Sequence, residues 1–154
     1  MKTSLVFSIL LLAGLTTVAA ADKADDAKEI QGTWLPVKAQ LNGKPMKEEI
    51  LKMITLKLEG GKYEVTAENV DKGTYIMDPA ARPRTLDITG TEGPNVGKKI
   101  PAIYELEGDT LRVCYNLGGG TPPTEFRSQA GTQHFLVTYK RKKEAKEQST
   151  TKVK

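Results

Sequence analysis

Apolar and polar residues alternate along the chain after residue 32, and turn residues interrupt this alternation at intervals of roughly ten positions. We therefore predict strands over residues 33–41, 54–59, 62–67, 73–78, 84–89, 99–106, 110–115 and 134–140, with a shorter extended segment over 125–128. Gly60-Gly61 and Glu107-Gly108-Asp109 separate neighbouring strands and are typical of tight hairpin turns. Because no long amphipathic helix separates the strands, the chain is expected to be all-β and antiparallel. At this length such a meander closes into a barrel of about eight strands or folds into a sandwich.

The apolar residues of these strands share one face, and the opposite face carries mostly charged residues. The apolar positions are Leu56, Leu58, Tyr63, Val65, Tyr75, Met77, Leu86, Ile88, Tyr104, Leu106, Leu111, Val113, Tyr115, Phe135, Val137 and Tyr139. One buried and one solvated face is what a small barrel requires. All five tyrosines fall on the buried face, where each hydroxyl needs a hydrogen-bond partner. They are expected either at the rims and in the core, or along a cavity with some polar character.

Two short helical segments are expected near the N-terminus. Residues 22–31 are polar with good helix formers, and Gly32 stands where such a helix would end. Residues 45–53 begin with a proline and carry two glutamates in the first turn, which favours one or two helical turns. Ile50 and Met53 share one side of this segment. The segment would therefore cover an open barrel end as a lid, pack outside the barrel, or plug its floor.

The first 21 residues are predicted to be a signal peptide. Lys2 supplies the positive start, residues 5–15 form an apolar run, and small residues up to Ala20 and Ala21 offer a cleavage site. An uncleaved N-terminal anchor is the alternative. We expect export to the periplasm or the extracellular space, with cleavage after Ala20 or Ala21. About 133 residues then remain, enough for one domain, which we place at 22–141.

The net charge of +4 belongs to the C-terminus and not to a basic face. Residues 140–154 hold seven Lys or Arg and two Glu, whereas the body of the domain sums to about −2. Residues 142–154 are expected to form a disordered or frayed basic tail that could associate with an anionic surface or an envelope protein. No aromatic residues interleave with these basic ones, so binding of nucleic acid is not expected.

Residues with catalytic or metal-binding chemistry are sparse. Cys114 is the only cysteine, so no internal disulfide forms, and its place in a strand favours a buried thiol. His134 is the only histidine, which excludes a metal site built from several histidines of one chain. A Cys114–His134 nucleophilic pair would need neighbouring strands and would lie on the solvated face, and Gly118-Gly119-Gly120 lacks the Lys-Ser/Thr of a phosphate-binding loop. We expect no enzyme activity, no metal and no cofactor.

Two short features resemble the lipocalin-like barrels. Gly32-Thr33-Trp34 opens the first strand after a short helix, and Lys140-Arg141 ends the last strand. The resemblance implies a barrel in which a basic side chain packs on the tryptophan face and closes the floor, a sensible cation–π contact. It thus gives Gly32, Trp34 and Arg141 structural roles in closing the barrel.

A longer stretch, from Gly73 to Arg141, resembles a family of exported lipocalin-like domains of unknown function that is abundant in planctomycete bacteria. The matching pieces are Gly73-Thr74-Tyr75, Asp78-Pro79, Pro83-Arg84-Thr85-Leu86-Asp87-Ile88, Gly93-Pro94, Gly97-Lys98, Ile103-Tyr104-Glu105-Leu106, Gly108-Asp109-Thr110-Leu111, Cys114 and Pro123-Thr124-Glu125-Phe126. Pro122 stands where the family pattern usually carries an arginine. The resemblance implies the fold and the compartment, and it implies no activity.

Two functions follow as hypotheses. The first is a non-enzymatic, monomeric, extracytoplasmic barrel that binds a small, mainly apolar ligand in its interior. Tyr75, Tyr104 and Tyr115 are its candidate polar contacts, and Arg112 is a lesser candidate because its parity places it outside the barrel. The second is an interaction module whose barrel is filled by side chains and whose loops and basic tail bind an envelope protein or an anionic surface.

Overall fold

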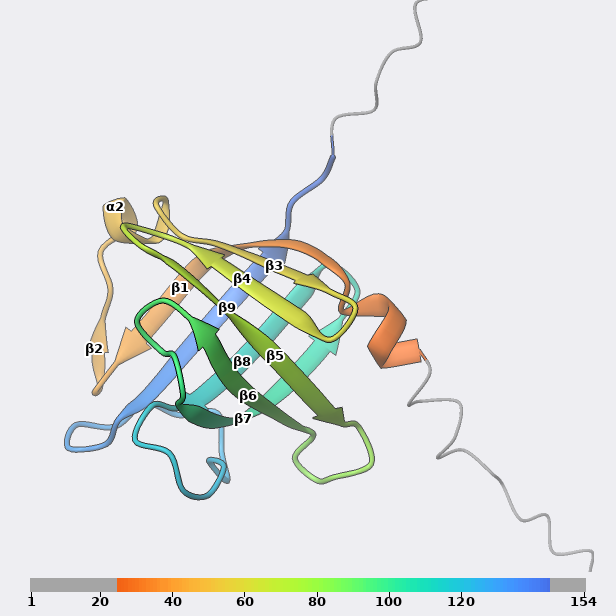
Figure 1. The fold of residues 1–154 in the computed structure, drawn as a ribbon. Coiled ribbons are helices and arrows are strands. Elements are labelled where there is room, and N and C mark those ends of the chain that lie inside the picture. The colour runs from red at the N-terminus through yellow and green to blue at the C-terminus, as the bar shows by residue number, and fades with distance from the viewer. Residues whose placement is uncertain (1–24, 145–154) are drawn as a thin grey trace, which may run out of the picture.

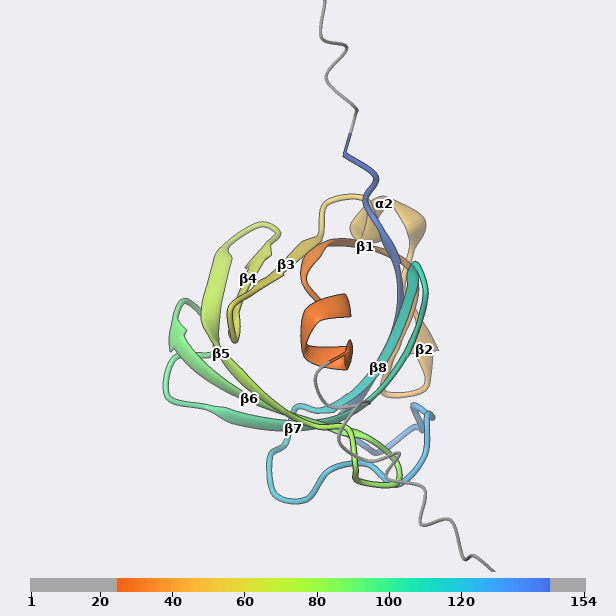
Figure 2. The same ribbon diagram turned by 90° about the vertical axis from the view of Figure 1, so that its right-hand side faces the viewer.

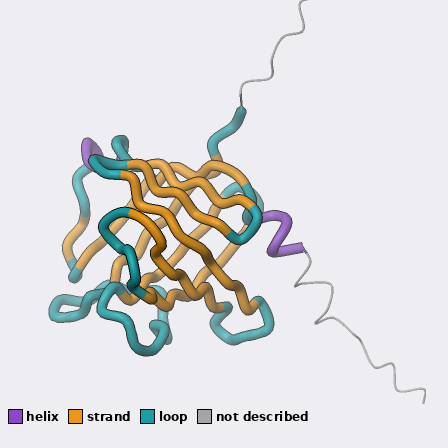
Figure 3. Tube along the Cα trace, viewed as in Figure 1, coloured by secondary structure: helices purple, strands orange, loops and turns teal. Residues whose placement is uncertain are grey.

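The computed structural model describes residues 25–144, which form one antiparallel sheet closed into a barrel (Figures 1 and 3). The predicted signal peptide, and the basic tail beyond residue 144, lie outside the described residues. The strands are β1 (Gly32–Leu41), β2 (Lys44–Pro45), β3 (Thr55–Glu59), β4 (Lys62–Thr66), β5 (Val70–Asp78), β6 (Thr85–Glu92), β7 (Lys99–Glu107), β8 (Thr110–Asn116) and β9 (His134–Arg141). The one helix that carries a label, α2, spans Glu48–Leu51.

Eight of these strands make the barrel wall, each hydrogen-bonded to its neighbour in the chain order β1, β3 and then β4 to β9. The barrel closes because β9 also pairs antiparallel with β1, from Trp34 opposite Arg141 to Leu41 opposite Phe135. β2 is an extra strand that pairs only with the end of β1. The predicted antiparallel up-and-down barrel is therefore confirmed, and it is consistent with a lipocalin-like fold.

One local prediction about strands differs from the structure. The extended segment predicted over 125–128 is not a strand; it belongs to the long connection between β8 and β9. Pro122 and Pro123 lie just before the predicted segment, and because they lack backbone N–H groups they cannot donate to a ladder that would lead into it. The strand predicted over 33–41 is observed as β1, which contains an irregularity between Pro36 and Lys38. This bulge reverses the alternation, so that Trp34, Pro36 and Ala39 are all buried and Val37 and Lys38 are both exposed.

The barrel has two unlike ends. A helical turn over residues 25–29 lies at one end, which we call the floor; viewed along the barrel, it stands in the middle of the ring of strands (Figure 2). The other end, which we call the mouth, is formed by α2 and by the connections 67–69, 93–98 and 117–133. Trp34, Tyr104 and Ile30 are completely buried and fill the barrel next to the floor.

Candidate functional site

The floor is closed by a set of contacts between β1, β9 and the N-terminal helical turn. The indole N–H of Trp34 donates to the carbonyl oxygen of Ile30 at 2.9 Å. The guanidinium of Arg141 lies over the Trp34 ring, 4.2 Å from its centroid, and donates to the carbonyl oxygens of Gln31 and Glu29 at 2.6 and 2.7 Å. These carbonyls end the helical turn, where a cation is favourable. Gly32 has a φ of 126°, and a Cβ there would lie 3.1 Å from Arg141.

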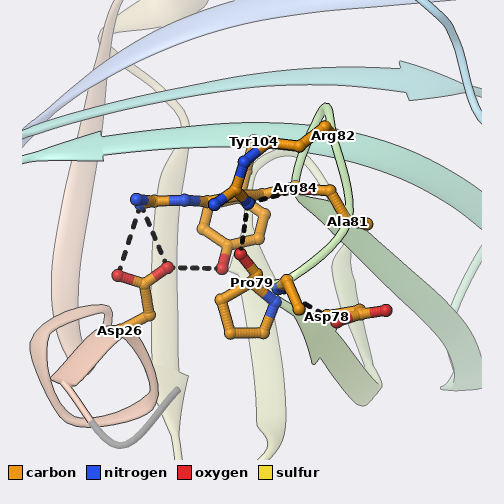
Figure 4. A network of polar contacts seen from close by, with 8 residues as sticks. Asp26, Asp78, Pro79, Ala81, Arg82, Arg84 and Tyr104 are labelled. Atoms are coloured by element: carbon orange, nitrogen blue, oxygen red, sulfur yellow. Dashed lines mark hydrogen bonds and ion pairs between the residues drawn. The ribbon is translucent and has the colours of Figure 1, made fainter. Parts of the chain in front are cut away.

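A buried ionic network holds the same helical turn against the wall (Figure 4). The Asp26 carboxylate accepts from the Tyr104 hydroxyl at 2.6 Å and pairs with the Arg84 guanidinium at 3.2 Å. Burial, followed by the hydrogen bond to Asp26, raises the pKa of Tyr104 well above its usual value. The Tyr104 hydroxyl is therefore neutral and donates its proton to Asp26 at the floor. Tyr104, which the sequence made a candidate ligand contact, does not line the cavity described next. Its hydroxyl binds Asp26 instead.

Between the floor and the mouth lies a cavity of about 560 Å³. Its volume falls in the range of about 300–1,000 Å³ that small-molecule sites occupy. Its apolar wall consists of inward-facing side chains from six strands: Leu56, Leu58, Val65, Leu86, Ile88, Ile100, Leu111, Val113 and Phe135. The alternation seen in the sequence thus places one apolar residue after another on the inside of the barrel.

Four tyrosines also line this cavity: Tyr63, Tyr75, Tyr115 and Tyr139. The hydroxyls of Tyr115 and Tyr139 lie 3.2 Å apart and are hydrogen-bonded to each other. The Tyr75 hydroxyl accepts a longer hydrogen bond of 3.4 Å from Gln31. Burial raises the pKa of Tyr75 and Tyr115 above the usual value and that of Tyr139 to about 12, so these hydroxyls are uncharged at neutral pH.

A second polar group lies toward the mouth. Tyr63 donates to the buried carboxylate of Asp71 at 3.0 Å, and Asp71 accepts from both the backbone N–H and the side-chain amide of Asn95 at 2.9 Å. Asp71 is at the start of β5, whereas Asn95 belongs to the connection before β7. The carboxylate therefore ties this connection to the wall at the edge of the cavity.

The position of α2 at the mouth agrees with a lid, but its cavity-facing residues differ from those predicted. Ile50 and Met53 are 40% and 60% exposed, and neither lines the cavity. Leu51, which is buried, and Ile54 line it instead. The helix itself is only four residues long, so the turn that follows it determines which side faces inward. Helical spacing applied over residues 45–53 therefore predicted the wrong cavity-facing residues.

Arg112, Cys114 and His134 all lie on the outside of the wall. Arg112 pairs with Glu105 at 2.7 Å and lies 4.3 Å from the centroid of Phe126, away from the cavity. Cys114 is completely buried beneath the β8–β9 connection, with its Sγ 3.6 Å from the Arg127 carbonyl oxygen, and burial raises its pKa. His134 is opposite Asn116 and not opposite Cys114, and no hydrogen bond joins His134 to the thiol within residues 25–144.

Sequence reasoning missed Asp26 and the site role of Asp71. Asp71 shares the inward parity of Tyr75, a signal that was available but was hidden because the strand was predicted to begin at residue 73. Nothing in the sequence distinguishes Asp26 from Asp25, since only the packing of the helical turn buries one of them.

No protein-family model matches this chain, and the search of curated proteins returned no match. Over residues 25–144, no group of three His, Cys, Asp or Glu is placed to hold a metal ion. The same part of the chain has no helix with the length and apolar content needed to cross a membrane.

Proposed function

We propose that the protein is a non-enzymatic carrier or sensor that binds a small, mainly apolar ligand inside its barrel. The observation that carries this proposal is the cavity of about 560 Å³ with an apolar wall and a few uncharged hydroxyls. Apolar surface in such a cavity favours an apolar guest, and a small number of polar groups orients it. Tyr75 and Tyr115 are the predicted contacts that line the cavity, and Tyr139 joins them.

The cavity disfavours the second hypothesis, in which side chains fill the barrel. Side chains do fill the region next to the floor, where Trp34 and Tyr104 are completely buried. They leave the middle of the barrel open toward the connections 67–69 and 93–98, whose residues line the cavity. A molecule can thus reach the interior from the mouth while the floor stays closed.

The proposal includes export and membership of the exported lipocalin-like family. Both rest on the sequence, that is, on the signal-peptide pattern of residues 1–21 and on the matching segments between Gly73 and Arg141. An exported, monomeric binding protein would meet its ligand outside the cytoplasm. Mass spectrometry of the N-terminus of the protein from its own host's envelope should find cleavage after Ala20 or Ala21.

The binding experiment uses the neutral dye N-phenylnaphthylamine and a matched pair of cavity and surface variants. Ile88 lines the cavity, whereas Ile76, on the adjacent strand, is 73% exposed. Ile88→Trp should narrow the cavity and weaken dye binding by about tenfold or more, since the larger ring occupies part of the space that the guest needs. Ile76→Trp should leave binding unchanged. Saturable dye binding near one equivalent supports the proposal, and absence of binding, or equal loss in both variants, rejects it.

A further inference from the structure

The Tyr115–Tyr139 pair holds one hydrogen-bond donor that its own contacts do not use. Each hydroxyl has a single proton, and only one of the two protons lies in the 3.2 Å hydrogen bond between them. The other proton finds no acceptor among the described side chains or backbone groups. Because both tyrosines line the cavity, this proton is available to a guest.

Because the pair is buried, a hydroxyl proton without an acceptor is unfavourable there. Tyr115 and Tyr139 are 9% and 4% exposed, so neither hydroxyl is freely solvated. Burial also keeps both pKa values above the usual one, so the pair does not lose its second proton at neutral pH. A buried donor without an acceptor is unfavourable, and a guest that supplies an acceptor oxygen removes that penalty.

The charges around the cavity indicate that this acceptor is uncharged. The only charged side chains of the described residues that line it are Glu68, Asp71 and Lys98. Two of the three are carboxylates, and Asp71 already accepts hydrogen bonds from Tyr63 and Asn95. An anionic guest such as a fatty-acid carboxylate would meet a net negative lining and lose its hydration, since the one lining cation, Lys98, is an exposed residue of the connection at the mouth.

We infer that the ligand is an uncharged, mainly apolar molecule with a carbonyl or ether oxygen, and that this oxygen accepts a hydrogen bond from the Tyr115–Tyr139 hydroxyl pair. This inference rests on the proposed function and names the ligand class for the same cavity. Tyr75 is the other hydroxyl on the cavity wall without a described acceptor, so it is the competing donor that the test has to distinguish from the pair.

The test compares benzophenone with diphenylmethane, which has almost the same shape but no oxygen, by displacement of N-phenylnaphthylamine from the full-length protein. In the double variant Tyr115→Phe/Tyr139→Phe, benzophenone should bind about three- to tenfold more weakly, the worth of one hydrogen bond. Diphenylmethane should bind within about twofold of its original affinity, since only hydroxyls are removed. Either single variant should retain benzophenone binding, because the remaining hydroxyl then donates its own proton.

Each other outcome has a distinct meaning. If the double variant weakens both compounds equally or neither, or if Tyr75→Phe weakens benzophenone as much as the double variant does, the assignment to the pair is wrong while the binding function stands. If benzoylbenzoate, which adds a carboxylate, binds more tightly than benzophenone, the ligand is an anion and the inference about charge is wrong. If the dye itself does not bind, the proposed function fails, and the inference fails with it.

Discussion

Gly73 shows how closely the wall is packed beside the cavity. A Cβ at this position would collide with the Thr89 carbonyl oxygen and would approach Cε1 of Tyr63 to 2.5 Å. The missing side chain thus lets the Tyr63 ring lie close to Gly73 of β5 while its hydroxyl reaches Asp71. Glycine is required here by this close approach and not by an unusual φ.

We therefore expect Gly73→Ala to lower the free energy of unfolding by about 2 kcal/mol or more, because the methyl group must displace backbone or ring. Urea titration followed by circular dichroism measures this. Gly118→Ala is the control: its Cβ would meet only the flexible ends of Asn116 and Gln133, so a change within about 0.5 kcal/mol is expected. Equal effects in both variants would show that steric crowding at residue 73 is not the cause.

At the scale of elements, the helical turn over 25–29 is held to the barrel by one buried charge. Asp26 is 7% exposed and contacts both Tyr104 and Arg84, whereas its neighbour Asp25 is exposed. Removing one member of such a network leaves its partners without a counter-charge or acceptor. The adjacent aspartates therefore provide a matched pair of variants.

Asp26→Asn should lower the stability of the protein by about 1–3 kcal/mol, since it weakens the contacts to Arg84 and Tyr104. Asp25→Asn should have little effect. Thermal unfolding by circular dichroism gives both values. If the two variants melt alike, the helical turn is not held by this network, and the cation–π and carbonyl contacts of Arg141 alone close the floor.

The sequence predicted the elements well wherever alternation was uninterrupted, as in β3, β4 and β8. It was less informative in β1, where the bulge at Pro36–Lys38 changes the parity, and at β2, which is only two residues long. The tyrosines were placed on the inner face from parity alone. Which tyrosines contact each other was not predictable, because the Tyr115–Tyr139 contact depends on the register of β8 against β9. The hydrogen bond of Tyr104 depends on the position of Asp26 in the helical turn, which the sequence does not indicate.

At the scale of the whole molecule, all five tyrosines point inward and all have raised pKa values. Burial is the largest cause in each case. In the unfolded chain they would ionise near pH 10. The folded state therefore keeps protons that the unfolded state releases, and the stabilisation this gives is complete below about pH 10 and is lost as pH rises further.

We expect the barrel to unfold cooperatively in alkali. For Tyr139, whose pKa is raised to about 12, the unfolding free energy should fall by about 1.4 kcal/mol per pH unit between pH 10 and 12. Tyrosinate absorbance and far-ultraviolet circular dichroism, followed together, should change in one step well above pH 10. Tyrosinate absorbance that rises near pH 10 while the barrel signal persists would mean that the hydroxyls are open to solvent.

Both ends of the described chain leave from the floor. Residue 25 begins the helical turn there, and after Arg141 the backbone N–H of Lys142 donates to the Thr33 carbonyl oxygen at 2.8 Å. A fusion partner, a surface or a lipid anchor attached next to residue 25 or residue 144 would therefore lie behind the closed end and leave the mouth unobstructed. A copy immobilised at residue 25 or residue 144 would present its mouth away from the support, which makes the protein suited to ligand screening on a sensor chip.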